Sequence, residues 1–327
     1  MRRLNRLIRQ ERGASAVLFG LLLIPLLGSG AIAVDVGALY SDKASLQNGA
    51  DAAALQVAIT CAANETSPSC LSASPSGIAG LNDPVNGASI QSVAVNTSSN
   101  LVTVTVQTAN LGVRHPLASL LPGVGSSTIV RAAGSAEWGV PVSGPAIALA
   151  IGVCEFVDNP PQTPPTKIVV QYETVTRHNC GPLQNAPGGF GWLPSANCTV
   201  FIDITSPWIA SKTGNSTSGT GCTDAGLAAL LGTTIFVPIY DDFMGTGNNV
   251  QFHIAKFAAF TLTGFKVSGS NAYVDPTAPI PAGGGNWRGL QGYFVKYVSV
   301  SDVFKLGDPG PGDDLGAYLV RLTLRTS

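Results

Sequence analysis

The chain has 327 residues, of which 45% are apolar and 11% are charged, with a formal net charge of −1. Typical soluble domains carry about 25% charged residues, so this composition is unusual for a cytosolic protein. The 38 glycines and 22 prolines favour a turn-rich, β-leaning body over a helical bundle. A net charge near zero gives no excess of basic residues of the kind that binds nucleic acid, so no nucleic-acid partner is expected.

An uncharged apolar run occupies residues 14–34. A helix of these 21 residues spans about 30 Å, the thickness of the hydrocarbon core of a bilayer. Residues 1–13 contain five arginines and one glutamate, and the positive-inside rule places this basic segment in the cytoplasm. We therefore predict a single-pass transmembrane helix at 14–34 in a lipid bilayer, with the bulk of the chain extracytoplasmic.

A cleavable signal peptide is the competing interpretation of this segment. The basic residues, the apolar run and the small-residue sequence Ala31-Ile32-Ala33 have the required form. Both interpretations export the body of the chain. Retention as an anchor is favoured, because a helical pattern continues beyond the run and no proline interrupts residues 26–67.

That continuing pattern predicts a juxtamembrane helix over residues 35–63. Apolar residues recur along one face of it at helical spacing and are candidates for helix packing: Val36, Leu39, Leu46, Ala50, Ala53 and Val57. Such a stripe packs either on its own domain or against long helices of other proteins, and the sequence leaves both readings open.

Three separated sequence pieces occur in order within residues 10–60. They are Arg12-Gly13, AVDVG at 33–37 and LQNGADAAAL at 46–55. Together they resemble the N-terminal region of TadE/TadG-like proteins of the Flp (Tad) pilus assembly system, and TadG-like members in particular. One departure is Gly49, where the family usually has alanine. The resemblance implies a bacterial membrane protein that contacts other Tad or pilus-assembly proteins, and we place those contacts on the N-terminal helix.

Two sequence features of related protein classes are missing from this chain, and their absence limits which Tad-system role is expected. Type IV-like prepilins are cut after a glycine and carry glutamate five residues into the mature chain. Here Gly13 would be the cut site and Leu18 the fifth residue, so a polymerising pilin is not expected. The chain also lacks the Asp-x-Ser-x-Ser string that begins the metal site of the von Willebrand type A domain found in some TadG-like proteins.

The remainder of the chain is predicted to be mainly β. Residues 64–140 form a loop and a small β unit, with a hairpin turn at 97–100. A Pro/Gly-marked join at 141–145 leads to a β-rich exported domain at 141–327. Its expected strands are 146–156, 167–173, 199–204, 234–240, 250–262, 292–304 and 316–324, with a short helix at 224–231. The fold class is therefore α+β: one long N-terminal helix, then a sandwich or barrel-like exported region.

Six cysteines, an even number in an exported chain, predict disulfides: Cys61, Cys70, Cys154, Cys180, Cys198 and Cys222. Cys61 and Cys70 are close enough in sequence to bridge the helix end to the next loop. The other four cysteines allow three pairings, of which we favour Cys154–Cys180 and Cys198–Cys222. No pair has the short CxxC spacing usual for structural zinc.

Two aromatic residues, Phe190 and Trp192, stand among glycines at 188–193. They form either a ligand-stacking platform or a tight turn whose aromatics fill the core, and the core is favoured. This segment also resembles exported parts of TadG-like proteins.

Signals of catalysis are weak. His115, His178 and His253 lack metal-type spacing, and no nucleophile elbow or P-loop occurs. Loop acids at 308, 313 and 314 are candidates for calcium, although solvated loop acids are commoner. We expect no enzyme, no cofactor and no metal.

These observations predict a membrane-anchored exported component of a Flp/Tad-type pilus assembly or secretion apparatus, acting through protein–protein contacts and not catalysis. The alternative is a cell-surface adhesin or binding module with an N-terminal anchor or a cleaved signal peptide. An exported enzyme is the third reading, for which the sequence supplies no convincing nucleophile, metal site or acid pair.

Overall fold

The computed structural model describes residues 4–82, 87–109, 112–120, 123–157, 160–171, 190–213, 220–246, 249–267, 272–279, 287–300, 303–308 and 316–323. The chain divides into two compact units. Unit 1 comprises residues 1–136 and 322–327, and unit 2 comprises residues 137–321.

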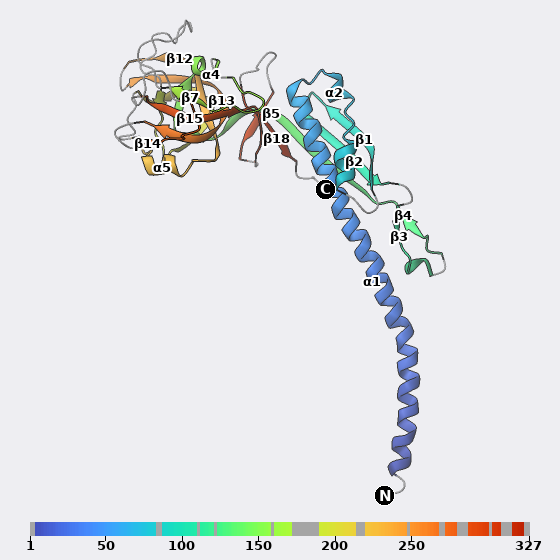
Figure 1. Ribbon diagram of the computed structural model, residues 1–327. Coiled ribbons are helices and arrows are strands. Elements are labelled where there is room, and N and C mark those ends of the chain that lie inside the picture. The colour runs from blue at the N-terminus through green and yellow to red at the C-terminus, as the bar shows by residue number, and fades with distance from the viewer. Residues whose placement is uncertain are drawn as a thin grey trace. The chain divides into compact units, whose positions relative to one another are not determined.

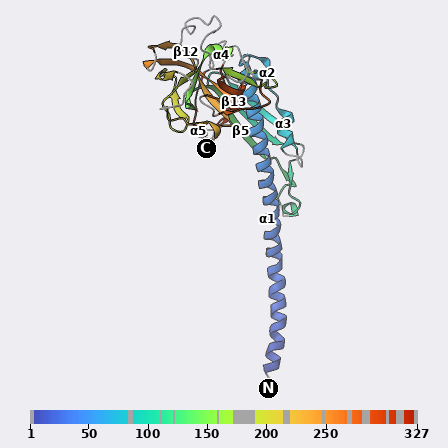
Figure 2. The ribbon, with the colours of Figure 1, turned by 60° about the vertical axis from the view of Figure 1, so that its left-hand side comes forward.

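Unit 1 is built on one helix, α1 (Leu4–Ala63), which contains 60 residues (Figures 1 and 2). At about 1.5 Å per residue it is roughly 90 Å long, about three times the thickness of a bilayer's hydrocarbon core. Pro25 lies inside the helix and does not end it. The prediction of one long N-terminal helix followed by mainly β structure is confirmed.

The C-terminal half of α1 packs on a small antiparallel sheet. Its strands are β1 (Ala88–Asn96), β2 (Leu101–Thr108) and the first part of β5 (Arg131–Ile147), in that order. The β1–β2 register pairs Asn96 with Leu101, which confirms the predicted hairpin turn. Strand β2 contacts α1 and buries alternate valines, Val102, Val104 and Val106. Two short helices, α2 (Pro68–Leu71) and α3 (Ser76–Leu81), also contact α1.

A second feature of unit 1 is a flap, defined as residues 113–120 and 123–128. It contains β3 (Val113–Arg114), the 3-10 helix η1 (Ala118–Leu120) and β4 (Ser127–Thr128), and β3 pairs with β4. Figure 1 shows β3 and β4 farther toward the N-terminal end of α1 than β1 and β2. The flap starts after Gly112, whose φ is +78°; a Cβ there would lie 2.4 Å from the Thr128 carbonyl oxygen, so only glycine fits.

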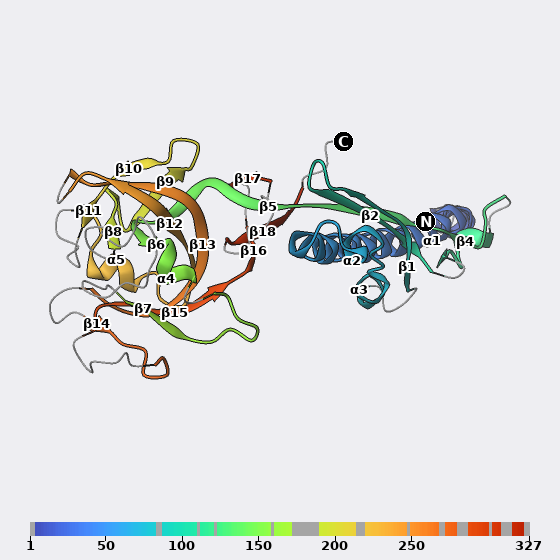
Figure 3. The same cartoon turned by 90° about the horizontal axis from the view of Figure 1, so that it is seen from above.

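Unit 2 contains a curled, half-barrel-like sheet, whose strands curve in the view of Figure 3. The strand order is β11-β8-β6-β12-β13-β15-β7, and β10 and β14 also pair with β13. Its strands are β6 (Leu149–Gly152), β7 (Ile168–Gln171), β8 (Phe190–Trp192), β10 (Trp208–Ala210), β11 (Lys212–Thr213), β12 (Thr234–Met244), β13 (Gln251–Lys266), β14 (Ala272–Tyr273) and β15 (Gly289–Val295).

The other strands of unit 2 gather around the second part of β5. Strands β9, β17 and β18 pair with β5, and β16 runs parallel to β18. Their bounds are β9 (Thr199–Asp203), β16 (Tyr297–Ser299), β17 (Lys305–Gly307) and β18 (Tyr318–Leu322).

Two short helices contribute to the core of unit 2. Helix α4 (Val153–Val157) places Phe156 edge-on against Phe294, with ring centroids 4.7 Å apart. Helix α5 (Asp224–Ala228) buries Leu227 in the same cluster, and the Thr223 hydroxyl caps it by accepting from the Gly226 N–H. The predicted helix near residue 224 is therefore confirmed, with Thr223 as its cap.

The structure corrects two of the expected strands. The segment 146–156 is not one strand, because β6 ends at Gly152 and α4 begins at Val153. Burial of Phe156 in the core decides this, and a short apolar run alone does not distinguish strand from helix. The segment 292–304 likewise breaks up: β15 ends at Val295, and β16 begins at Tyr297 and joins the other group of strands. The expected join at 141–145 lies inside β5.

Gly134 sets how closely β5 approaches α1. A Cβ at this position would lie 2.5 Å from Asp51 Oδ1 and 2.6 Å from the Ala50 carbonyl carbon. Both neighbours belong to the packed half of α1, so a side chain here would push the helix off the sheet. We expect Gly134→Val to lower the free energy of unfolding of unit 1 by about 1–3 kcal/mol.

Chemical denaturation of the detergent-solubilised chain measures this change. Gly80→Ala is the matched control, because a Cβ at Gly80 meets nothing within 4 Å. Equal stability of both variants would show that α1 does not depend on this close approach.

An ion pair in unit 2 predicts a pH dependence. The Lys167 ammonium lies 2.7 Å from Asp275 Oδ2, and the Asp275 N–H donates to Gln291 Oε1 at 2.8 Å. The Lys167 ammonium, together with the hydroxyls of Thr263 and Thr277, holds the pKa of Asp275 well below its ordinary value of 3.8. A lowered carboxyl pKa stabilises the fold fully above that ordinary value, and the contribution is lost as the pH falls below it.

We expect Lys167→Met to destabilise unit 2 at neutral pH, with a difference from the parent chain that shrinks as the pH falls through about 4. Urea unfolding between about pH 3 and pH 7 measures it. Lys305→Met removes the same charge from an exposed position and serves as the control. A difference independent of pH would exclude the ion pair as its cause.

Candidate functional site: the N-terminal helix and the Asp35 boundary

Residues 15–34 of α1 present a continuous apolar surface. From residue 15 to residue 34, all residues are exposed apart from the half-buried Ala31. Phe19 is 70% exposed and Ile24 is 75% exposed. An apolar patch of this size marks an interaction site with protein or membrane. Within the described part of the chain, α1 is the one helix whose length and composition suit a membrane crossing.

Asp35 lies at the end of this exposed segment and is almost fully buried. Its Oδ2 accepts hydrogen bonds from the backbone N–H groups of Leu117 at 3.1 Å and Ala118 at 2.5 Å. These two donors lie at the start of η1, where N–H groups have no partner within the helix. The Asp35 carboxylate therefore caps η1 and ties the flap to α1.

The flap also has hydrogen bonds of its own. The His115 N–H donates to the Ser126 carbonyl at 2.9 Å, and the Ser119 N–H donates to the His115 carbonyl at 3.0 Å. His115 Nε2 lies 2.7 Å from the Thr128 hydroxyl. The flap is thus an ordered hairpin whose position on α1 is set by Asp35.

Beyond Asp35 the helix becomes a packed element. Four of the packing candidates are buried, Leu46, Ala50, Ala53 and Val57, whereas Leu39 is half-buried and Val36 is 41% exposed. Successive residues on a helix are about 100° apart, so Val36 turns away from the side on which Asp35 meets the flap. The packed face therefore begins later than the sequence pattern indicated.

Gly49 lies at the contact between α1 and α3. A Cβ at this position would be 3.0 Å from the Ala79 carbonyl oxygen, which is tighter than ordinary van der Waals contact. Glycine therefore replaces the alanine of the TadG-like pattern at the point where α3 approaches α1 closely. Helices α1 and α3 both belong to unit 1.

The structure places the predicted cysteines as follows. A disulfide joins Cys61, in the last turn of α1, to Cys70 in α2. A second disulfide joins Cys198, just before β9, to Cys222, just before α5. Cys154 lies in α4, and its expected partner Cys180 lies outside the described residues.

The aromatic segment and the candidate acids lie in unit 2. Trp192 is buried in the core of this unit. Phe190 opens β8, but its side chain lies outside the described part of the chain. His178, Asp313 and Asp314 also lie outside it. Across the described ranges, no three His, Cys, Asp or Glu side chains form a group that could hold a metal ion.

The two described histidines lie in different units. His115 belongs to the flap, and His253 Nδ1 lies 2.5 Å from Asp241 Oδ1 in unit 2.

Sequence reasoning missed the pairing of Asp35 with the flap. The two segments are 82 residues apart, and no local spacing connects them. The signal available was a short leucine-containing segment at 117–121, enclosed by Gly112 and Gly123.

Residues 13–60 match the family described as "Putative Flp pilus-assembly TadE/G-like". The match covers most of the exposed apolar half of α1, the Asp35 boundary and nearly all of the packed half. It confirms the resemblance stated from the sequence. No curated protein and no solved structure matches the chain. The family relationship therefore rests on α1, and the β-rich remainder lies outside the match.

The Asp35 contact with the flap is testable by hydrogen exchange. We expect Asp35→Ala to leave the Leu117 and Ala118 amides without their acceptor and so to remove two hydrogen bonds, worth about 0.5–1.5 kcal/mol each. The Leu117 and Ala118 amides should then exchange faster by orders of magnitude, while amides in β2 keep their protection. Asp203→Asn, a charge change in unit 2, is the control. Unchanged protection of Leu117 in Asp35→Ala would show that the flap is held by other contacts.

Proposed function

For this chain with its TadE/G-like segment at residues 13–60, we propose the role of a membrane-anchored, exported component of a Flp/Tad-type pilus assembly or secretion apparatus. The observation that carries the proposal is the division of α1 into two halves. Residues 15–34 expose only apolar and small uncharged residues, and the C-terminal half is packed into the folded unit 1. A bilayer is the environment that covers the first half.

The basic segment at 1–13 supports an orientation with the N-terminus in the cytoplasm, and with the β-rich part of unit 1 and all of unit 2 on the opposite side. Retention of the helix is supported by its continuity, because no break separates the apolar half from the packed half. Cleavage after Ala33 would remove the apolar segment and leave Asp35 next to a new, charged N-terminus. We therefore place the protein in the bacterial cell membrane as a single-pass protein.

Action through protein contacts is supported by small residues on the exposed segment. Ala16 and Gly20 are four residues apart, a spacing that lets a second membrane helix approach closely. A Cβ at Gly20 would meet nothing within 4 Å, so this side of α1 is open within unit 1. We propose that partner proteins of the pilus system contact α1 there, and that the protein has no catalytic role.

The test is complementation of a deletion strain. Deletion should abolish pili in electron micrographs, and the wild-type gene should restore them. Leu22→Arg places a charge near the middle of the span, at a cost of about 2.5–3.5 kcal/mol, and should reduce both membrane retention and piliation. Leu22→Phe is the matched control and should behave as the wild type.

A further variant separates anchoring from partner contact. Gly20→Ile should leave the protein in the membrane fraction but reduce piliation, because the added side chain keeps a partner helix away. Leu21→Ile changes a neighbouring residue without closing that approach. Normal piliation in the deletion strain would overturn the proposal, and loss of surface attachment alone would favour the adhesin.

A further inference from the structure

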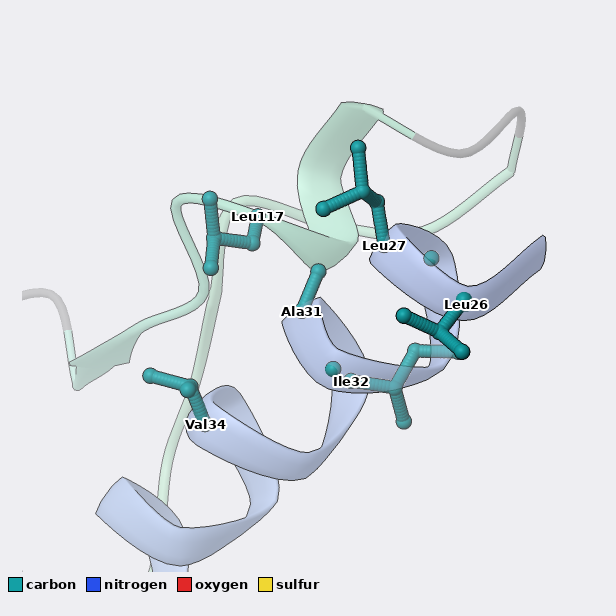
Figure 4. Close-up of a pocket in the computed structure, with 8 residues that line it drawn as sticks. Leu26, Leu27, Ala31, Ile32, Val34 and Leu117 are labelled. Carbon is teal, nitrogen blue, oxygen red and sulfur yellow. The ribbon is translucent and has the colours of Figure 1, made fainter. Parts of the chain in front are cut away.

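A cavity of about 770 Å³ lies between the flap and the exposed half of α1. Its lining comprises Leu26, Leu27, Ala31, Ile32 and Val34 from α1, and Leu117 from the flap, together with two helix glycines. Figure 4 shows Leu27 and Ala31 projecting from the helix on the side where the flap carries Leu117. Every side chain that lines this groove is apolar.

A second hollow lies on the flap itself and is polar. It has a volume of about 360 Å³ and is lined by Arg114, Pro116, Ser119, Ser126 and Ser127. Because Pro116 and Leu117 are consecutive, the two hollows adjoin the same turn of the flap. A guanidinium with neighbouring hydroxyls is a donor set that suits a phosphate group.

We propose that the flap rests on the outer leaflet of the membrane and binds a phospholipid there. The lipid's acyl chain occupies the apolar groove beside Leu117, and its phosphate meets Arg114. This inference rests on the proposed membrane anchoring. The α1 side of the groove consists of residues 26–34, which belong to the same uncharged run that the bilayer covers. The groove is therefore continuous with the lipid-facing surface of the helix.

The hydrogen bonds of the flap suit a position at the membrane surface, close to the hydrocarbon. Irregular backbone is costly near hydrocarbon unless its polar groups have partners within the protein. Asp35 accepts from Leu117 and Ala118, and the carbonyls of Ser126 and His115 accept from His115 and Ser119. The flap also covers the Asp35 carboxylate on the side where the helix enters the apolar region. An apolar groove beside an arginine fits a phospholipid better than it fits the apolar face of another helix.

Photo-crosslinking in the native membrane tests the proposal with the full-length protein. A benzoylphenylalanine replaces Leu117, and mass spectrometry identifies what it captures. Leu22 is the control for anchoring, since it lies in the exposed run. Leu81 is the control for water exposure, since it is an 81% exposed leucine of unit 1 at the end of α3.

Phospholipid adducts are expected at positions 117 and 22 and not at position 81. Arg114→Gln should lower the lipid yield at position 117 severalfold and leave the yield at position 22 unchanged. Lipid at position 22 but not at 117 would overturn the flap inference and leave the anchor intact. Absence of lipid at both positions would overturn the anchor itself. A discrete protein adduct at position 117 would show that a partner helix occupies the groove. An unchanged lipid yield in Arg114→Gln would show that Arg114 does not bind the phosphate.

Discussion

A carboxylate that is removed from water requires hydrogen-bond donors, and at Asp35 two backbone amides of the flap supply them. Because the flap is 82 residues away in sequence, this single contact fixes a distant segment at one level of α1. Below that level the helix is exposed and apolar, and above it the helix is packed on protein.

Because α1 is continuous, the Asp35 contact lies within one helix that joins the exposed apolar segment to the packed segment. A helix satisfies its own backbone polar groups, so one continuous helix suits both the proposed lipid environment and packing against a sheet. In unit 1 small residues allow close packing on α1: Gly134 of β5 lies against Ala50 and Asp51 on the sheet side, and Gly49 lies against α3. The Cys61–Cys70 disulfide then ties the last turn of the helix to α2. The exposed apolar segment and the folded part of unit 1 are therefore joined by one continuous helix.

The sequence predicts those parts of the molecule that depend on local pattern. The apolar run at 14–34, the absence of proline from residues 26–67 and the turn at 97–100 are all local, and the structure has the helix and the hairpin they indicate. Contacts between distant segments were out of reach. The Asp35 bond to Leu117 has no local signature, and the fate of 146–156 is decided by Phe156 packing on Phe294. The groove at the flap depends on such long-range contacts, and the sequence therefore did not indicate it.

The flap also bears on the distinction between a fibre subunit and an assembly component. In a fibre built on N-terminal helices, neighbouring helices surround each helix along its length. The flap lies on one side of α1 beside residues 26–35, which leaves less of the helix surface free for neighbouring helices at that level. The side near Gly20 stays open within unit 1. Together with Leu18 at the position where prepilins carry glutamate, this arrangement favours the proposed assembly component over a subunit that polymerises.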